Sequence, residues 1–258
     1  MCRILFALGD GEEIKPLAEA LRRASEHDPY RLKLSGKESH ADGWGYVLLK
    51  DGEVYHYRSI EAIFEDEEGF SGLLNLLRGR VVLLAHARAA SQGGKSLFNV
   101  QPFPFSSCRG FSFWFLHNGD LNKEEIVRRA SFDGKDFQNA SDSYTFGAYL
   151  CRFLEGPDGK SLLRVYSAGV EVTKTSFNTM TLFMTPEGKW KAFVTAYMVQ
   201  PYLEDPVKRD YARLIELREP FAVASSTLGL YHEAEWRDVP NGSAYLVDEG
   251  SVVAMRLG

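Results

Sequence analysis

The clearest chemical candidate in the sequence is Cys2, which directly follows the initiator methionine. Removal of Met1 would leave the Cys2 thiol on the same residue as a free α-amino group, whose ordinary pKa is about 7.7–8. Near neutral pH part of that amine is an unprotonated base, so one residue would supply both a nucleophile and its base. A single cysteine is more often an ordinary thiol, so this interpretation depends on the rest of the chain.

Two further segments place polar groups directly after predicted strands. Arg88 follows the apolar run 81–85, which is typical of a strand buried on both faces. Its guanidinium could be solvated at the surface, but its place after a buried strand favours a ligand-binding role. Asn118 and Gly119 follow the aromatic-rich run 111–116, and Asn-Gly alone favours a type I′ turn. A turn and a pair of hydrogen-bond donors for a ligand could coexist there.

Other polar residues have structural explanations that compete with chemistry. Ser141 and Asp142 begin a helical pattern, where either could be a helix cap, a substrate-binding group or both. Three histidines, at positions 40, 86 and 117, suggest a Cys-His pair. A histidine near a strand end is more often satisfied structurally, and an α-amine would make a histidine base unnecessary. We therefore assign no catalytic histidine.

Strand patterns outnumber helix patterns, and the helices are grouped between clusters of strands. Strands are expected at 3–8, 46–49, 54–57, 81–85, 111–116, 179–185, 191–198, 221–224, 243–247 and 252–257. Helices are expected for four turns after Asp10, over 60–77 with an interruption near Gly69, from Ser141, and over 208–217. This pattern predicts the α+β class and one domain over residues 1–258.

Composition narrows the class of protein. The chain has 258 residues, 45% of them hydrophobic, with a net charge of -5 and scattered basic residues, which argues against a nucleic-acid partner. Its three cysteines form no CxxC pair, and no metal-binding spacing is present, so we expect no metal. The sequence shows no secretory signal pattern and no membrane-length apolar run. We expect a cytoplasmic protein without a membrane partner.

Six segments, taken in order, resemble the class II glutamine amidotransferases, which are N-terminal nucleophile hydrolases. The segments are Met1-Cys2-Arg3, Asp42-Gly43-Trp44-Gly45, His86-Ala87-Arg88, Asn99 to Phe103, His117-Asn118-Gly119 and Ser141-Asp142. The resemblance is greatest to the stand-alone branch that includes the γ-glutamyl amide hydrolase of ergothioneine synthesis. It covers roughly residues 2–145, and the ending from Val239 to Gly242 followed by two strands is similar as well.

The resemblance implies a role for each group. Cys2 corresponds to the nucleophile, and Asn118 and Gly119 correspond to the donors for the tetrahedral oxyanion. Arg88 corresponds to the arginine that holds the glutamine α-carboxylate, for which its planar fork is suited. Asp142 corresponds to the aspartate that takes the α-ammonium.

Three positions depart from the family pattern. Ser91 and Gln92 stand where the family commonly has Thr and His beside the carboxylate. Ser91 keeps a hydroxyl donor, and Gln92 keeps an N–H donor that cannot become cationic. Gln101 stands where a histidine is expected before Pro-Phe. Carboxylate binding could therefore be weaker or less dependent on pH.

The fold implied by the resemblance is a four-layer αββα sandwich with two mostly antiparallel sheets. The implied reaction is thiol-dependent hydrolysis of the glutamine side-chain amide through a γ-glutamyl thioester on Cys2, with no metal or organic cofactor. The alternatives are hydrolysis of another γ-glutamyl amide and a non-catalytic glutamine-binding regulatory module. Because the motifs and closing strands take up the whole sequence, we expect the ammonia acceptor to be a separate synthase subunit.

Overall fold

A computed structural model describes residues 1–257 and divides them into two compact units. The first unit comprises residues 1–90, 95–102 and 200–239. The second comprises residues 91–94, 103–199 and 240–257. Each unit contains one antiparallel sheet and its own helices, so the expected α+β class is confirmed. One domain over residues 1–258 stays a prediction.

The sheet of the first unit has the strand order β11-β9-β10-β1-β4-β2-β3, with antiparallel neighbours throughout. Its strands are β1 (Arg3–Asp10), β2 (Trp44–Lys50), β3 (Glu53–Ser59), β4 (Arg80–Ala87), β9 (Leu214–Leu217), β10 (Phe221–Ser225) and β11 (Arg237–Asp238). The central strand β1 lies between β10 and β4, and residues of both its faces are buried, as its uninterrupted apolar sequence predicts.

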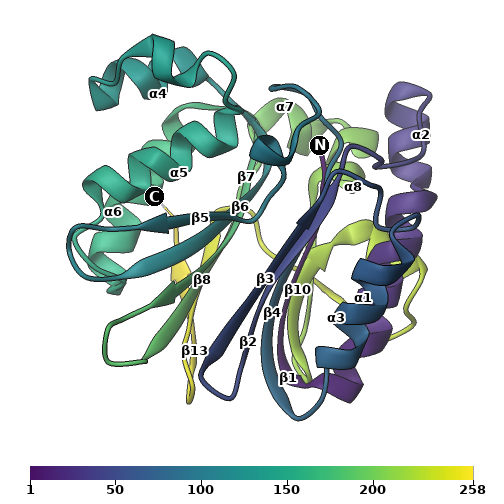
Figure 1. Ribbon diagram of the computed structural model, residues 1–258. Coiled ribbons are helices and arrows are strands. Elements are labelled where there is room, and N and C mark those ends of the chain that lie inside the picture. Colours follow the sequence, from purple (N-terminus) through teal and green to yellow (C-terminus); the bar gives the residue numbers. More distant parts are fainter. Residues whose placement is uncertain (258) are drawn as a thin grey trace. The chain divides into compact units, whose positions relative to one another are not determined.

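Helices cover one face of this sheet. The helices of the unit are α1 (Gly11–Glu26), α2 (Pro29–Ser35), α3 (Glu67–Leu76), α7 (Gln200–Glu204) and α8 (Pro206–Ala212), with 3-10 turns η1 (Leu97–Asn99) and η3 (Ser226–Leu230). Asp10 caps α1 by accepting the Glu12 N–H at 2.9 Å. Leu17 and Leu21 of α1 pack with Leu5 and Ala7 of β1, and α1 and α3 lie side by side (Figure 1).

The sheet of the second unit has the strand order β13-β12-β8-β7-β6-β5 and is also antiparallel. Its strands are β5 (Phe103–Ser106), β6 (Ser112–Leu121), β7 (Thr173–Met184), β8 (Trp190–Ala196), β12 (Ser243–Val247) and β13 (Val252–Arg256). Its helices are α4 (Lys123–Ala130), α5 (Asp142–Phe153) and α6 (Gly159–Glu171), with the 3-10 turn η2 (Gly134–Phe137). Phe115 of β6 packs on Phe146 of α5, and α5 lies along β5 and β6 (Figure 1).

Two helix predictions are wrong in part. The helix expected over 208–217 ends at Ala212, because Leu214–Leu217 pairs with β10 as a strand. The helix expected over 60–77 starts only at Glu67, where the Asp66 carboxylate caps it by accepting the Gly69 N–H at 2.9 Å. Gly69 does not interrupt this helix. No helix within residues 1–257 is long and apolar enough to cross a membrane.

Candidate active site

Cys2 lies at the start of the central strand of the first unit, next to the end of β4. The register of the two strands pairs Arg3 with Ala87, which brings Cys2 level with the loop that begins at Arg88. The Cys2 side chain is 8% exposed. Its Sγ accepts the Ala89 N–H at 3.3 Å and donates to the Ala89 carbonyl at 3.6 Å. Backbone groups of this loop therefore hold the thiol.

The loop that carries Arg88 and Ala89 is fixed by the segment before β2. The Arg88 N–H donates to the Gly43 carbonyl at 2.8 Å, and the Arg88 carbonyl accepts the Asp42 N–H at 3.0 Å. The Asp42 carboxylate accepts the Ala90 N–H at 2.9 Å. Gly43 has a φ of 108°, which favours glycine. The segments Asp42–Gly45 and His86–Arg88 thus hydrogen-bond to each other beside Cys2. Arg88 is only 3% exposed there.

Asn118 and Gly119 lie inside β6 of the second unit, opposite Asn178 and Phe177 of β7. The strand register shifts between Gly119 and Leu121, which marks a β-bulge. A Cβ at Gly119 would lie 1.8 Å from the Ser176 carbonyl oxygen, so only glycine fits. The type I′ turn favoured by Asn-Gly alone is therefore wrong, because long-range pairing with β7 overrides the local preference.

Asp142 is the first residue of α5, and the preceding Ser141 is the helix cap. The Ser141 hydroxyl accepts the Tyr144 N–H at 3.1 Å. Asp142 instead accepts the Leu121 N–H at 2.7 Å on one oxygen and the Ser143 N–H at 2.9 Å on the other. Burial raises the pKa of Asp142 to about 6. Its carboxylate thus braces the end of β6, just beyond Gly119.

Gln92 also contacts this end of β6. Its side-chain N–H donates to the Asp120 carboxylate and, at 3.3 Å, to the Leu121 carbonyl. Ser91 is exposed. In the first unit, Gln101 is buried, and the neighbouring Pro102 carbonyl accepts from His56 Nε2 at 3.0 Å. The second unit therefore brings together Asn118, Gly119, Gln92 and Asp142, and the first brings together Cys2 and Arg88.

The buried histidines with assigned hydrogen bonds have structural partners. His117 pairs with the Ser143 hydroxyl through Nδ1 at 2.9 Å and with the Ser176 carbonyl through Nε2 at 3.1 Å. Burial lowers its pKa to about 4. His40 Nε2 lies 2.8 Å from the Asp28 carboxylate. His86 is buried within β4.

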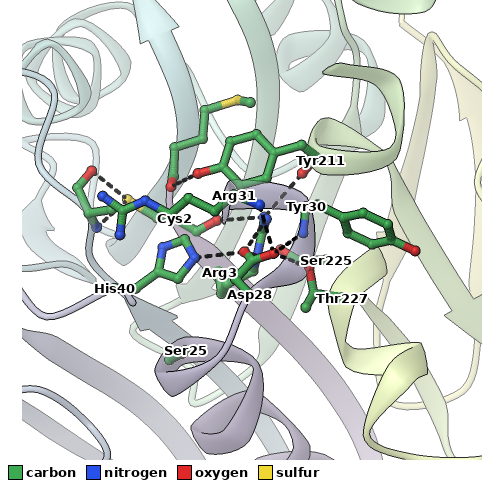
Figure 2. Close-up of polar contacts among 12 residues, drawn as sticks. Cys2, Arg3, Ser25, Asp28, Tyr30, Arg31, His40, Tyr211, Ser225 and Thr227 are labelled. Carbon is green, nitrogen blue, oxygen red and sulfur yellow. Dashed lines mark hydrogen bonds and ion pairs between the residues drawn. The ribbon is translucent and has the colours of Figure 1, made fainter. Parts of the chain in front are cut away.

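Sequence reasoning missed a polar network directly behind Cys2. Arg3 forms a buried ion pair with Asp28, and Tyr211 donates to the Met1 carbonyl (Figure 2). Arg3 appears in the first motif without a role. Asp28 followed by Pro29 carries the signal of a capped helix start, and it does cap α2. That signal could have located Asp28 but not its partner 25 residues away.

Parts of this chain are similar to known proteins. The class II glutamine amidotransferase family model matches residues 29–142. An amidophosphoribosyltransferase from Methanocaldococcus jannaschii is 31% identical over 109 residues, which are 42% of this chain and 22% of that protein. The chain thus spans about a fifth of this curated relative.

Solved structures share the fold at low identity. The glutamine phosphoribosylpyrophosphate amidotransferase from B. subtilis, solved with ADP and GMP, matches with a TM-score of 0.65 and 18% identity. That match covers 100% of this chain and 49% of the other. A glutamine aminotransferase class-II domain protein from Silicibacter pomeroyi matches with a TM-score of 0.53 and 14% identity, over 100% of both chains.

The family match and the fold likeness lead to the same result, and they confirm the resemblance seen in the sequence. Residues 29–142 match the class II glutamine amidotransferase family model, and the chain shares its fold with the B. subtilis glutamine phosphoribosylpyrophosphate amidotransferase.

Proposed function

We propose that this chain hydrolyses the side-chain amide of glutamine through a γ-glutamyl thioester on Cys2, after removal of Met1. One observation carries the proposal: the Cys2 thiol is held by the backbone of Ala89, directly after Arg88, at the start of the central strand. The family match supports the same reaction class. A reducing cytoplasm, expected from the cysteine pattern, suits a thiol nucleophile.

The chemistry requires two displacements at the amide carbon. The α-amine of Cys2 takes the thiol proton, and the sulfur attacks the carbon of the side-chain amide. The α-ammonium of Cys2 then returns the proton to the leaving nitrogen as the carbon–nitrogen bond breaks. Ammonia leaves, and the thioester remains. Water then attacks the thioester, releasing glutamate and restoring the thiol. We assign stabilisation of the oxyanion in both steps to the Asn118 side-chain N–H and the Gly119 backbone N–H.

Substrate recognition is assigned to groups of opposite charge. Arg88 would take the α-carboxylate through its planar fork, with Ser91 and Gln92 as neutral donors. Asp142 would take the α-ammonium. The deep burial of Arg88 and Asp142 supports this assignment, because a buried charge contributes most to binding when a ligand charge compensates it.

We further propose that the ammonia passes to an acceptor on a separate subunit. The match covers 49% of the B. subtilis amidotransferase chain. Adding host-cell fractions to a glutaminase assay tests this point. We expect the purified chain to be slow and a fraction that contains the partner to accelerate it, because an unpartnered site has mobile covering loops. A fast rate that no fraction changes would contradict the partner.

Steady-state turnover and covalent labelling test the reaction itself. We expect glutamate and ammonia from glutamine, and a glutamine-analogue electrophile should label only Cys2. Cys2→Ser should lose most turnover, whereas Cys108→Ser and Cys151→Ser, the matched controls, should change little. Turnover only of larger γ-glutamyl amides would indicate the alternative hydrolase, and glutamine binding without turnover would indicate a regulatory module.

A further inference from the structure

Arg3, the first residue of β1, is fully buried and points into a polar cluster behind Cys2 (Figure 2). Its Nε and Nη2 contact the Asp28 carboxylate at 2.6 Å and 2.5 Å. Its Nη1 donates to the Cys2 carbonyl at 3.0 Å and to the Tyr211 carbonyl at 3.1 Å. One side chain thus ties the main chain of the nucleophile to α8.

Asp28 is the centre that holds Arg3 in place. One carboxylate oxygen accepts the N–H groups of Tyr30 and Arg31, each at 3.1 Å, and the Thr227 hydroxyl at 3.3 Å. The other oxygen accepts from His40 Nε2 at 2.8 Å. Each oxygen therefore accepts several hydrogen bonds, and the partners come from β1, α2, the segment before β2 and η3 of the first unit.

The charges of this cluster balance internally. Burial alone would raise the pKa of Asp28, but the Arg3 guanidinium and the His40 hydrogen bond bring it to about 2. Burial lowers the pKa of His40 to about 3, so its imidazole is neutral and donates to the carboxylate. Asp28 thus carries the single negative charge that neutralises Arg3.

Tyr211 supplies the second contact with the N-terminal segment. Its ring lies over the Arg3 guanidinium, 4.2 Å from centroid to carbon. Its hydroxyl donates to the Met1 carbonyl at 2.6 Å. That oxygen belongs to the same planar peptide group as the Cys2 nitrogen, so the hydroxyl contacts the peptide group whose nitrogen becomes the α-amine.

A buried ion pair of this kind is poorly explained by stability alone. Desolvation of the two charges offsets most of their attraction, and apolar replacements of such pairs are often neutral. Chain ends fray unless they are held, whereas an N-terminal nucleophile must stay within a few tenths of an ångström of its position. The Arg3 contact with the Cys2 carbonyl does not involve Met1, so it can hold the main chain of the nucleophile after Met1 is removed.

We propose that Arg3, Asp28, His40 and Tyr211 position the N-terminal nucleophile. Arg3 fixes the Cys2 carbonyl, and the Tyr211 hydroxyl accepts an N–H of the α-amine that Met1 removal exposes. This contact leaves the nitrogen lone pair available for the thiol proton. All four are positioning residues, and the proposal rests on the proposed glutaminase reaction.

The test uses the full chain with two variants and two matched controls. Tyr211→Phe removes only the hydroxyl, and Asp28→Asn removes the charge that holds Arg3. Tyr57→Phe and Asp66→Asn are the controls, because Tyr57 donates to Asp66 at 2.7 Å and Asp66 caps α3 in the same unit. Intact mass first establishes that Met1 is removed from each protein. The readouts are kcat, KM for glutamine, the thermal midpoint, and hydrogen exchange of the N-terminal peptide.

We expect Tyr211→Phe to lower kcat about tenfold and Asp28→Asn about 100-fold, with KM changed less than about twofold, because positioning acts on the reaction and not on substrate affinity. Both controls should keep kcat while losing similar thermal stability. Exchange of the N-terminal peptide should rise in Asp28→Asn and not in Asp66→Asn. These two patterns would separate positioning from general destabilisation.

Several outcomes would overturn the proposal. One is native kcat in both variants with Met1 removed, and another is an equal loss of kcat in variants and controls. If Asp28→Asn fails to fold, Tyr211→Phe decides, since it keeps the ring over Arg3. If the native chain shows no turnover and no Cys2 labelling, the proposed function fails instead. The positioning proposal then depends on the N-terminal exchange rates, and equal rates in Asp28→Asn and Asp66→Asn would refute it.

Discussion

The Asp142 carboxylate accepts the backbone N–H of Leu121 at 2.7 Å, two residues beyond Gly119. Its second oxygen accepts the Ser143 N–H at 2.9 Å. The group to which we assign the substrate α-ammonium therefore also joins the start of α5 to the end of β6. A change at Asp142 should affect substrate affinity and the oxyanion donors together.

Substrate affinity should depend on the protonation of Asp142. Burial raises the pKa of this carboxyl to about 6, so the charge that attracts the α-ammonium is lost as pH falls through about 6. We expect KM for glutamine to rise by up to about tenfold per pH unit below that point. Steady-state kinetics measured from about pH 5 to about pH 8 test this dependence.

Asp142→Asn is the matched control for this dependence. It keeps one acceptor for Leu121 and removes the ionisation, so KM should be high and constant over the same pH range. Glutamine without its α-amino group should be rejected by the native protein and discriminated less by Asp142→Asn. A native KM that does not change with pH would contradict a role for Asp142 in binding the ammonium.

Arg88 should be required as an arginine and not only as a cation. Its planar fork can form two parallel hydrogen bonds with a carboxylate, which a lysine ammonium cannot. We expect Arg88→Ala to weaken substrate binding by on the order of 2–4 kcal/mol and Arg88→Lys to recover only part of that loss. Arg80→Ala at the exposed start of the same strand is the control. Equal KM values for Arg88→Lys and the native chain would exclude a bidentate contact.

Local patterns predicted most of the strands and several caps, because these depend on neighbouring residues. The apolar run 81–85 and the Asp10 cap could be recognised this way. The second half of 208–217 could not, because Leu214–Leu217 is a strand only through its pairing with β10. The same reason explains Asn118-Gly119, whose local turn preference gives way to β7.

The candidate site residues were predicted from the order of the motifs along the sequence. The buried contacts around Asp28 were not predicted. The order of six segments indicated Cys2 and Arg88, which one sheet register then brings together. Nothing in the sequence near Asp28 indicates Arg3 or Thr227 as its partners, since one lies 25 and the other 199 residues away. Such contacts depend on how the whole unit folds.

Stability should fall in mild acid because His117 is buried as the neutral imidazole. Burial lowers the folded-state pKa of His117 to about 4, whereas an unfolded histidine titrates near 6.5. Between these values the unfolded chain binds a proton that the folded chain does not. The stability from this residue is therefore full above about pH 6.5 and is lost as pH falls toward 4, by up to about 1.4 kcal/mol per pH unit.

Urea unfolding at several pH values measures this slope. His117→Gln should reduce the slope. His40, with its pKa lowered to about 3, acts in the same direction as His117, whereas Asp142, with its pKa raised to about 6, acts in the opposite direction. His27→Gln, which replaces an exposed imidazole, is the control substitution. A slope in His117→Gln as steep as in the native chain would contradict this account.

Gly119 should tolerate no side chain, because a Cβ there would lie 1.8 Å from the Ser176 carbonyl oxygen. In Gly119→Ala, β6 must therefore shift away from β7, which moves the Gly119 N–H and the Asn118 side chain together. We expect unfolding stability to fall by about 1–3 kcal/mol. We expect kcat to fall about 100-fold or more, since loss of one oxyanion donor alone has an effect of that size.

Gly250→Ala is the control for Gly119→Ala, because no atom lies within 4 Å of its added Cβ. If Gly119→Ala lost stability but kept native kcat, the oxyanion role of this bulge would be wrong, because the donors would have moved without consequence for the reaction.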